Sequence, residues 1–138
     1  MSEGSPLADE ETLLQADPRL RQAVVDFNNA DWYACHDGLE ALWQETQGPM
    51  RPVLQGLLQI AVAELHLERD NRHGATVLMG EGLGRLRRCG DEALGLTLAP
   101  LRLMAAERLS ALQQQGDLHS LPLPRLELAR AAGTSPVH

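Results

Sequence analysis

Apolar residues recur every three or four positions through most of this 138-residue chain. Residues at that spacing share one face of an α-helix, so each repeating set indicates a helix with one side on a core. Asp, Asn or Pro precedes several of these sets and Gly follows most of them, as is typical of helix starts and stops. The pattern predicts about five helices, over roughly residues 17–29, 31–47, 52–70, 75–90 and 100–115, with Gly90 as a left-handed cap of the fourth.

Two of these helices, 31–47 and 52–70, are separated by a short break at Gly48-Pro49, so we expect them to form an antiparallel pair. Composition supports helices, because hydrophobic residues make up 43% and aromatic residues only 3%. We predict an all-α fold: a single-domain bundle of about five helices around that pair. The chain divides into an acidic N-terminal leader, with one or two turns of helix after Ser5-Pro6, a helical bundle domain and a Pro-containing C-terminal tail, at residues 1–16, 17–116 and 117–138.

The net charge of −7 argues against nucleic acid as a partner, because an acidic chain repels the phosphate backbone. All 12 basic residues are Arg, so there is no lysine to form a Schiff base. The cysteines, Cys35 and Cys89, are isolated, which fits a reducing cytosol. The longest apolar run, Val53 to Leu67, is too short and too interrupted to span a membrane. We predict a soluble, cytoplasmic protein.

The central helix pair carries polar side chains where a bundle would otherwise use apolar ones. On the first helix, His36 and Glu40 lie one turn apart, and Trp43 follows at the same edge. On the second helix, three polar residues fall within roughly 40° of one another on a helical wheel and form what we call the Gln/His stripe: Gln55, Gln59 and His66.

Glu64 and Glu68 bear on the direction in which the Gln/His stripe points. Both glutamates lie nearly opposite the stripe on the same wheel. Charged residues usually face water, so we expect the two glutamates on the outside. The stripe would then face the interior of the bundle.

These residues predict a site for a divalent metal ion or a small polar ligand. With the turn near residue 49, His36 comes level with about residue 63, within about one turn, or about 5 Å, of His66. Imidazole and carboxylate groups are common ligands of divalent metals. We therefore assign His36, Glu40 and His66 as candidate metal ligands.

Gln55 and Gln59 would orient these ligands or hold a substrate from the surrounding shell. A site with three protein ligands leaves coordination positions open to water. If the protein is an enzyme, metal-dependent hydrolysis by an activated water is the chemistry that such a site favours.

A non-catalytic interaction or scaffold protein is the alternative. A His–Glu pair one turn apart is a common ion pair worth a few tenths of a kcal/mol. The Gln/His stripe, with the indole of Trp43, would form a hydrogen-bond network that sets how the helices pair. The apolar positions of 52–67 would also suit a homodimer interface, while the sequence identifies no other protein partner.

The same segment resembles a known family. Residues His36 to Trp43 match the His-x-x-x-Glu-x-x-Trp/Tyr signature of small bacterial and archaeal proteins catalogued as domain of unknown function 309. Further matches follow in the same order, over about residues 24–86: Leu54 to Ala61, His66, and Asn71-x-x-Gly74-Ala75.

The resemblance implies a small helical protein with a metal site suggested at this signature and no established activity. It adds Asn71 and Trp43 to Gln55 and Gln59 as candidate ligand-binding residues. Asp37 departs from the family pattern, because many relatives have Glu after the histidine, and a shorter side chain changes the reach of that carboxylate.

Overall fold

The computed structural model describes residues 6–129, with side chains from residue 10 onward. This part of the chain forms six helices and three two-residue strands. The helices are α1 (Pro6–Ala16), α2 (Pro18–Asn28), α3 (Trp32–Glu45), α4 (Arg51–Glu68), α5 (Arg72–Leu86) and α6 (Ala99–Gln113), and the strands are β1 (Glu92–Ala93), β2 (Leu96–Thr97) and β3 (Glu127–Leu128). The predicted all-α fold is confirmed only in part: this part of the chain is mainly helical, but it also contains a small sheet that was not predicted.

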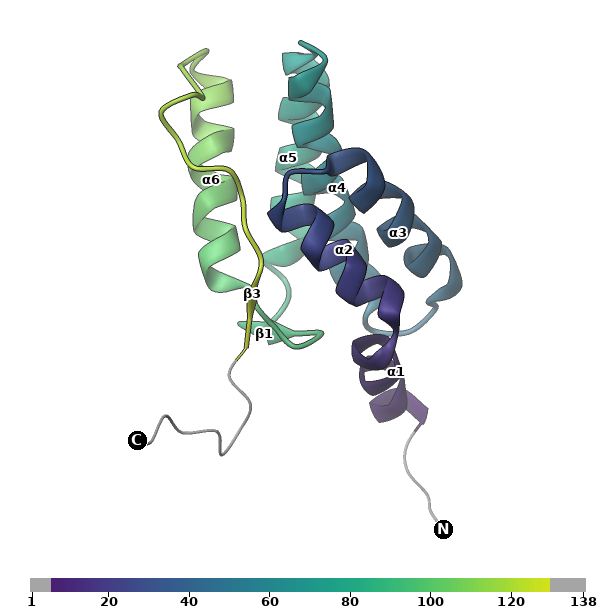
Figure 1. Cartoon of the computed structure of the whole chain (residues 1–138). Helices are drawn as coiled ribbons and strands as arrows, with labels where there is room; N and C mark the ends of the chain where they lie inside the picture. Colours follow the sequence, from purple (N-terminus) through teal and green to yellow (C-terminus); the bar gives the residue numbers. More distant parts are fainter. Residues whose placement is uncertain (1–5, 130–138) are drawn as a thin grey trace, which may run out of the picture.

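Five of these helices, α2 to α6, correspond to the predicted ones, and α1 lies in the segment predicted as a leader. α4 lies between α3 and α5 and contacts both, with α2 beside α3 and α6 on the other side of the molecule (Figure 1). After α6 the chain returns along that helix to the sheet, which lies at the end of the molecule where α6 begins (Figure 1). The predicted central pair is thus the middle of a row of helices.

The core consists mainly of Leu and Ala side chains from the six helices, from β1 and β2, and from the loops beside them. Two glycines bring α4 and α5 close together, because a Cβ built on Gly82 would lie 2.9 Å from the carbonyl oxygen of Gly56. Only glycine fits such an approach without a shift of the backbone. The largest fully buried side chains are Phe27, Leu39, Leu42, Leu54, Leu57, Ile60, Met79, Leu83, Leu86, Leu96, Leu98 and Leu101.

Helix starts follow the predicted caps more closely than helix ends do. Asp17 and Asp31 accept backbone N–H groups at the starts of α2 and α3. Gly90 was expected as a left-handed cap, and that expectation is wrong, since Gly90 is not in that region and α5 ends at Leu86. The turn after α5 stays right-handed, with the N–H of Cys89 donating to the Leu86 carbonyl, so a left-handed residue is not needed there.

The three-stranded sheet joins the chain after α5 to the C-terminal segment. Leu94 and Gly95 have φ values of 57° and 75° and form the two-residue turn between β1 and β2. β3 pairs antiparallel with β2, and the side chain of Asn28 holds Leu126 through bonds of 2.8 and 3.0 Å to its N–H and carbonyl. The first part of the predicted tail is therefore docked on the bundle.

Two adjacent glutamates tie α1 to the rest of the molecule. Glu10 accepts the N–H groups of Gly48 and Met50 at 2.8 and 2.9 Å, and Glu11 accepts the N–H of Leu94 at 2.7 Å. The predicted leader thus contains a helix attached to the α3–α4 turn and to the hairpin. These long-range bonds have no signature in the local sequence.

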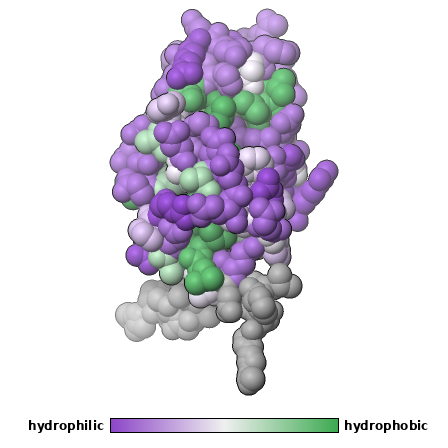
Figure 2. Space-filling model, turned by 90° about the vertical axis from the view of Figure 1, so that its right-hand side faces the viewer, coloured by the Kyte–Doolittle hydropathy of each residue, from purple (hydrophilic) through white to green (hydrophobic). Residues whose placement is uncertain are grey.

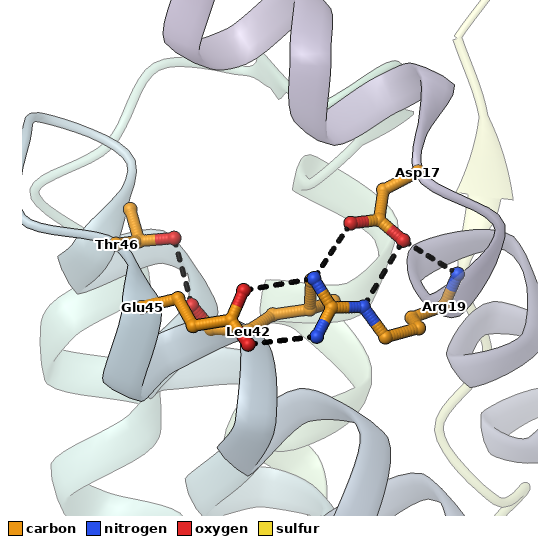
Figure 3. Close-up of polar contacts among 5 residues, drawn as sticks. All are labelled: Asp17, Arg19, Leu42, Glu45 and Thr46. Atoms are coloured by element: carbon orange, nitrogen blue, oxygen red, sulfur yellow. Dashed lines mark hydrogen bonds and ion pairs between the residues drawn. The ribbon is translucent and has the colours of Figure 1, made fainter.

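Arg19 links the start of α2 to the end of α3 (Figure 3). Its guanidinium donates two bonds of 2.8 Å to the Glu45 carboxylate and bonds of 2.9 and 3.2 Å to Asp17. These bonds and the nearby positive charge lower the pKa of both carboxyls. Beside them, the Thr46 hydroxyl donates to the Leu42 carbonyl at 2.7 Å, where α3 ends (Figure 3).

The face of the molecule drawn in Figure 2 is mainly polar. Each helix within residues 6–129 is too short or too polar to cross a lipid bilayer. The side of the molecule that carries α3 is mainly hydrophilic, and its hydrophobic residues form small, separate patches (Figure 2).

Candidate ligand-binding face

Glu64 overturns the expectation that the Gln/His stripe faces the interior. Its side chain is only 2% exposed, and the Arg108 guanidinium of α6 donates to it twice, at 2.6 and 2.7 Å. Burial raises the pKa of Glu64, and the bonds from Arg108 offset part of that rise. The physical reason for the error is this partner: an arginine 44 positions away lets a glutamate occupy the core, which periodicity cannot reveal.

The Gln/His stripe therefore lies on the outer side of α4. Gln55, Gln59 and His66 are all half-buried rather than buried, while the residues on the opposite side of the helix are fully buried. Because α4 lies between α3 and α5, the outer side of α4 forms a surface with one of these helices on each side (Figure 1). Glu68 is exposed, as predicted.

His36 and Glu40 form the predicted pair along the edge of α3. Nε2 of His36 lies 3.1 Å from the Glu40 carboxylate, and its Nδ1 lies 3.2 Å from Asp37 without making a hydrogen bond. The ring is 28% exposed, and Tyr33 lies one turn before it with the ring centroids 6.1 Å apart. Both side chains of the pair are therefore partly exposed to solvent.

Trp43 lies seven residues after His36, and so on the same edge of α3. The Arg51 guanidinium stacks over its ring at 4.2 Å and donates to the Trp43 and Thr46 carbonyls at 2.8 and 3.1 Å. Arg51 therefore fixes the α3–α4 turn and the position of the indole. The indole N–H is buried and has no hydrogen-bond partner.

Gln59 bridges α4 and α5. Its amide nitrogen donates to Glu81 at 2.9 Å, whereas its amide oxygen is buried without a partner. Gln55, one turn earlier, lines a cavity at the end of α5. Sequence reasoning missed Glu81 and Arg51, because each acts through a neighbouring helix.

His66 is engaged elsewhere, at the turn between α4 and α5. The Asn71 amide nitrogen lies 3.1 Å from Nδ1 of His66, and an amide nitrogen can only donate, so this ring nitrogen accepts. The Asn71 amide oxygen accepts the N–H of Gly74 at 2.9 Å and caps α5. The structure therefore gives His66 and Asn71 a role in the turn.

The structure brings His36 and Glu40 together but does not bring His66 to them. Among the described side chains, no three His, Cys, Asp or Glu residues are grouped so that they could hold one metal ion. The same side chains leave four buried polar atoms without a partner, on His36, Trp43, Gln59 and Arg85. Native proteins leave few such atoms, so each calls for an explanation.

We call five of these residues the motif face: His36, Glu40 and Trp43 on α3, and Gln55 and Gln59 on α4. The hairpin register places Gln59 level with about Glu40, one turn from His36 on one side and from Trp43 on the other. Three of the four atoms without a hydrogen-bond partner thus belong to α3 and α4, the two helices of this hairpin.

Comparison of the sequence with models of known protein families gives a match over the segment that contains the motif face. The model of a family described as "Domain of unknown function (DUF309)" matches residues 20–78, a range that contains the whole motif face. No curated protein matches the chain. The match covers 59 of the 138 residues and supports the resemblance of this segment to the DUF309 family.

Proposed function

We propose that the motif face binds a small polar molecule that offers a hydrogen-bond acceptor to Trp43 and a donor to Gln59. The observation that supports this proposal is two buried atoms without a hydrogen-bond partner, Nε1 of Trp43 and Oε1 of Gln59. Nδ1 of His36 also makes no hydrogen bond, although the Asp37 carboxylate lies 3.2 Å from it. A buried donor or acceptor left without a partner costs about 1–3 kcal/mol, so a ligand that pairs with it gains that energy.

The surrounding contacts hold these groups in place for such a ligand. Glu40 orients the His36 ring at 3.1 Å, Arg51 stacks on Trp43 at 4.2 Å, and Glu81 holds the Gln59 amide at 2.9 Å. Groups fixed before binding lose little freedom on binding, which favours affinity. The hydrophilic character of the α3 side suits a polar ligand better than an apolar one (Figure 2).

A divalent metal is the narrower form of this proposal. It would rest on His36 and Glu40, with water completing the coordination, because the accepting Nδ1 of His66 is committed to Asn71. Titration with Zn²⁺ tests this form directly: binding in the wild type and its loss in His36→Ala would support it. Equal, negligible zinc in both proteins, measured by mass spectrometry, would remove it.

The two tryptophans allow a direct test of the ligand proposal. In protein labelled with ¹⁵N-tryptophan, Trp43 and Trp32 each give one indole N–H signal. Trp32 is 2% exposed and packs edge-on against Phe27, so it serves as the internal reference. Small amides, amino acids and nucleosides, each with a donor and an acceptor, are added one at a time, and we expect at least one to shift the Trp43 signal alone.

Matched variants decide whether the shift reports this face. Gln59→Leu and His36→Ala should each weaken the response, whereas Gln47→Ala, at an exposed position outside the face, should not. The scaffold alternative predicts instead that both variants lower the melting temperature while no compound moves the Trp43 signal. That result would replace the ligand proposal with a structural role.

A further inference from the structure

A second set of polar groups lies at the end of α5, outside the motif face except for Gln55. A cavity of about 530 Å³ opens there between α1, the start of α4, the end of α5 and β1. We call it the α5-end cavity. Its polar lining comes from Glu11, Gln55, Arg85, Arg88, Cys89 and Glu92.

Arg85 differs from the other buried or half-buried arginines among residues 10–129. Four described arginines are buried or half-buried, and three of them donate to an acceptor: Arg51 to the Trp43 carbonyl, Arg102 to Asp91 and Arg108 to Glu64. Arg85 has no such acceptor among the described residues, and its Nε is buried and unpaired. A guanidinium that is always charged and partly removed from water is costly unless an acceptor faces it.

The acidic side chains of the cavity do not supply that acceptor. Glu11 accepts the N–H of Leu94 at 2.7 Å, and Glu92 is exposed on β1. Arg88, one turn after Arg85, adds a second positive charge to the lining. The two arginines therefore face a space that contains no counter-charge paired with them among residues 10–129.

The start of α4 adds to the positive character of this space. Pro52 and Val53 line the cavity, and this 18-residue helix has no side-chain cap at its first turn. The N-terminus of a helix carries partial positive charge, which favours anions. At this helix start the charge is partly offset, because the Glu10 carboxylate accepts the Met50 N–H, and Pro52 has no N–H to offer. This contribution supports the arginines and would not by itself define a site.

We propose that the α5-end cavity binds a small oxyanion, a phosphate or a carboxylate, through Arg85, with Arg88 and the Gln55 amide as further donors. Arginine presents a planar fork that matches both groups in a bidentate manner, so the two sources share one chemistry. This site shares only Gln55 with the motif face, and His36 takes no part in it.

The test uses the full chain and two probes, inorganic phosphate and succinate, titrated by calorimetry at constant ionic strength set with chloride. We expect saturable binding of one or both, and the preferred probe identifies the class of ligand. Arg85→Met should weaken binding at least about tenfold, the effect of losing one charge-assisted pair. Arg87→Met is the matched control, because Arg87 is exposed and does not line the cavity, and it should bind as the wild type does.

Cys89 gives a second readout that needs no variant. Its thiol lines the cavity and donates to the Arg85 carbonyl at 3.4 Å, so a bound anion should slow its alkylation by iodoacetamide. Absence of saturable binding of both anions, or equal weakening by Arg85→Met and Arg87→Met, would overturn the proposal. His36→Ala should leave phosphate and succinate binding unchanged, so failure here is distinguishable from failure at the motif face.

Discussion

The ion pair of Glu64 with Arg108 is the contact whose removal should affect stability most. The two side chains are 2% and 4% exposed, and they are joined by two bonds of 2.6 and 2.7 Å. Replacing Glu64 by Leu leaves a buried guanidinium that cannot lose its proton. Breaking a buried pair from one side costs about 3–5 kcal/mol.

That loss is large for a chain of this size. At about 2 cal/mol/K of unfolding entropy per residue, 138 residues convert 3–5 kcal/mol into a fall in melting temperature of roughly 10–17 °C. Arg108→Leu should be about as costly, and it also removes the 3.3 Å bond from Arg108 to the Pro122 carbonyl, which holds the returning C-terminal segment. The double variant, Glu64→Leu with Arg108→Leu, should recover most of the loss, because the unpaired charge is gone.

The two single variants should differ in their dependence on pH. Without Arg108, burial acts alone and raises the pKa of Glu64 further above its ordinary value of 4.5. A raised folded-state pKa means that stability is present below the unfolded value and is lost as the pH rises through the folded value. Arg108→Leu should therefore be least destabilised near pH 4 and most near pH 8, whereas Glu64→Leu carries its unpaired charge at both.

Urea unfolding of the wild type, the two single variants and the double variant at several pH values measures these changes in the free energy of unfolding. Glu68→Leu, one turn further along α4 at an exposed position, is the control and should change the free energy of unfolding by less than about 0.5 kcal/mol. If Glu64→Leu costs less than about 1 kcal/mol, or if the two single losses add up in the double variant, the pair is not a coupled buried unit and our reasoning is refuted.

Three further predictions follow from other contacts. Arg19→Met should lower stability at pH 7 and have no effect near pH 2. Arg19 lowers the pKa of Asp17 and Glu45, so their contribution to stability is present above the ordinary pKa values of 3.8 and 4.5 and is lost as the pH falls. Thermal unfolding across this pH range measures the effect, and a loss of stability that does not depend on pH would contradict the pairing. Gly82→Ala should lower the free energy of unfolding by about 1–3 kcal/mol, because its Cβ would meet the Gly56 carbonyl oxygen. Gly84→Ala, whose Cβ would have no atom within 4 Å, should raise the free energy of unfolding by about 0.5–1 kcal/mol through helix propensity. Equal effects of the two variants in chemical denaturation would contradict the close approach of α4 and α5. Burial raises the pKa of Cys35 to about 12, so this thiol should react slowly in the folded protein. After iodoacetamide treatment at pH 8, mass spectrometry should find Cys89 labelled in the native protein and Cys35 labelled only after unfolding. Labelling of Cys35 in the native protein would contradict its burial.

The sequence by itself determined the helical class, five of the six helices and the residues of the motif. These follow from local physics: the 3.6-residue period, caps such as Asp17 and Asp31, and breaks such as Gly48-Pro49. The pairing of His36 with Glu40 was also predictable, because both residues lie on one helix and their spacing alone sets the distance. The signature from His36 to Trp43 also indicated, from local sequence alone, the family whose model matches residues 20–78.

Only the tertiary structure decided what the polar residues between helices do. Periodicity shows that Glu64 and the Gln/His stripe lie on opposite sides of α4, but it cannot show which side is inside. Arg108, on another helix, made that choice by neutralising Glu64 in the core. In the same way, Asn71 engaged His66, Glu81 held Gln59, and α1 enclosed the cavity beside Arg85. Each outcome depends on a partner distant in sequence, and the energy of such a contact appears only once the chain has folded.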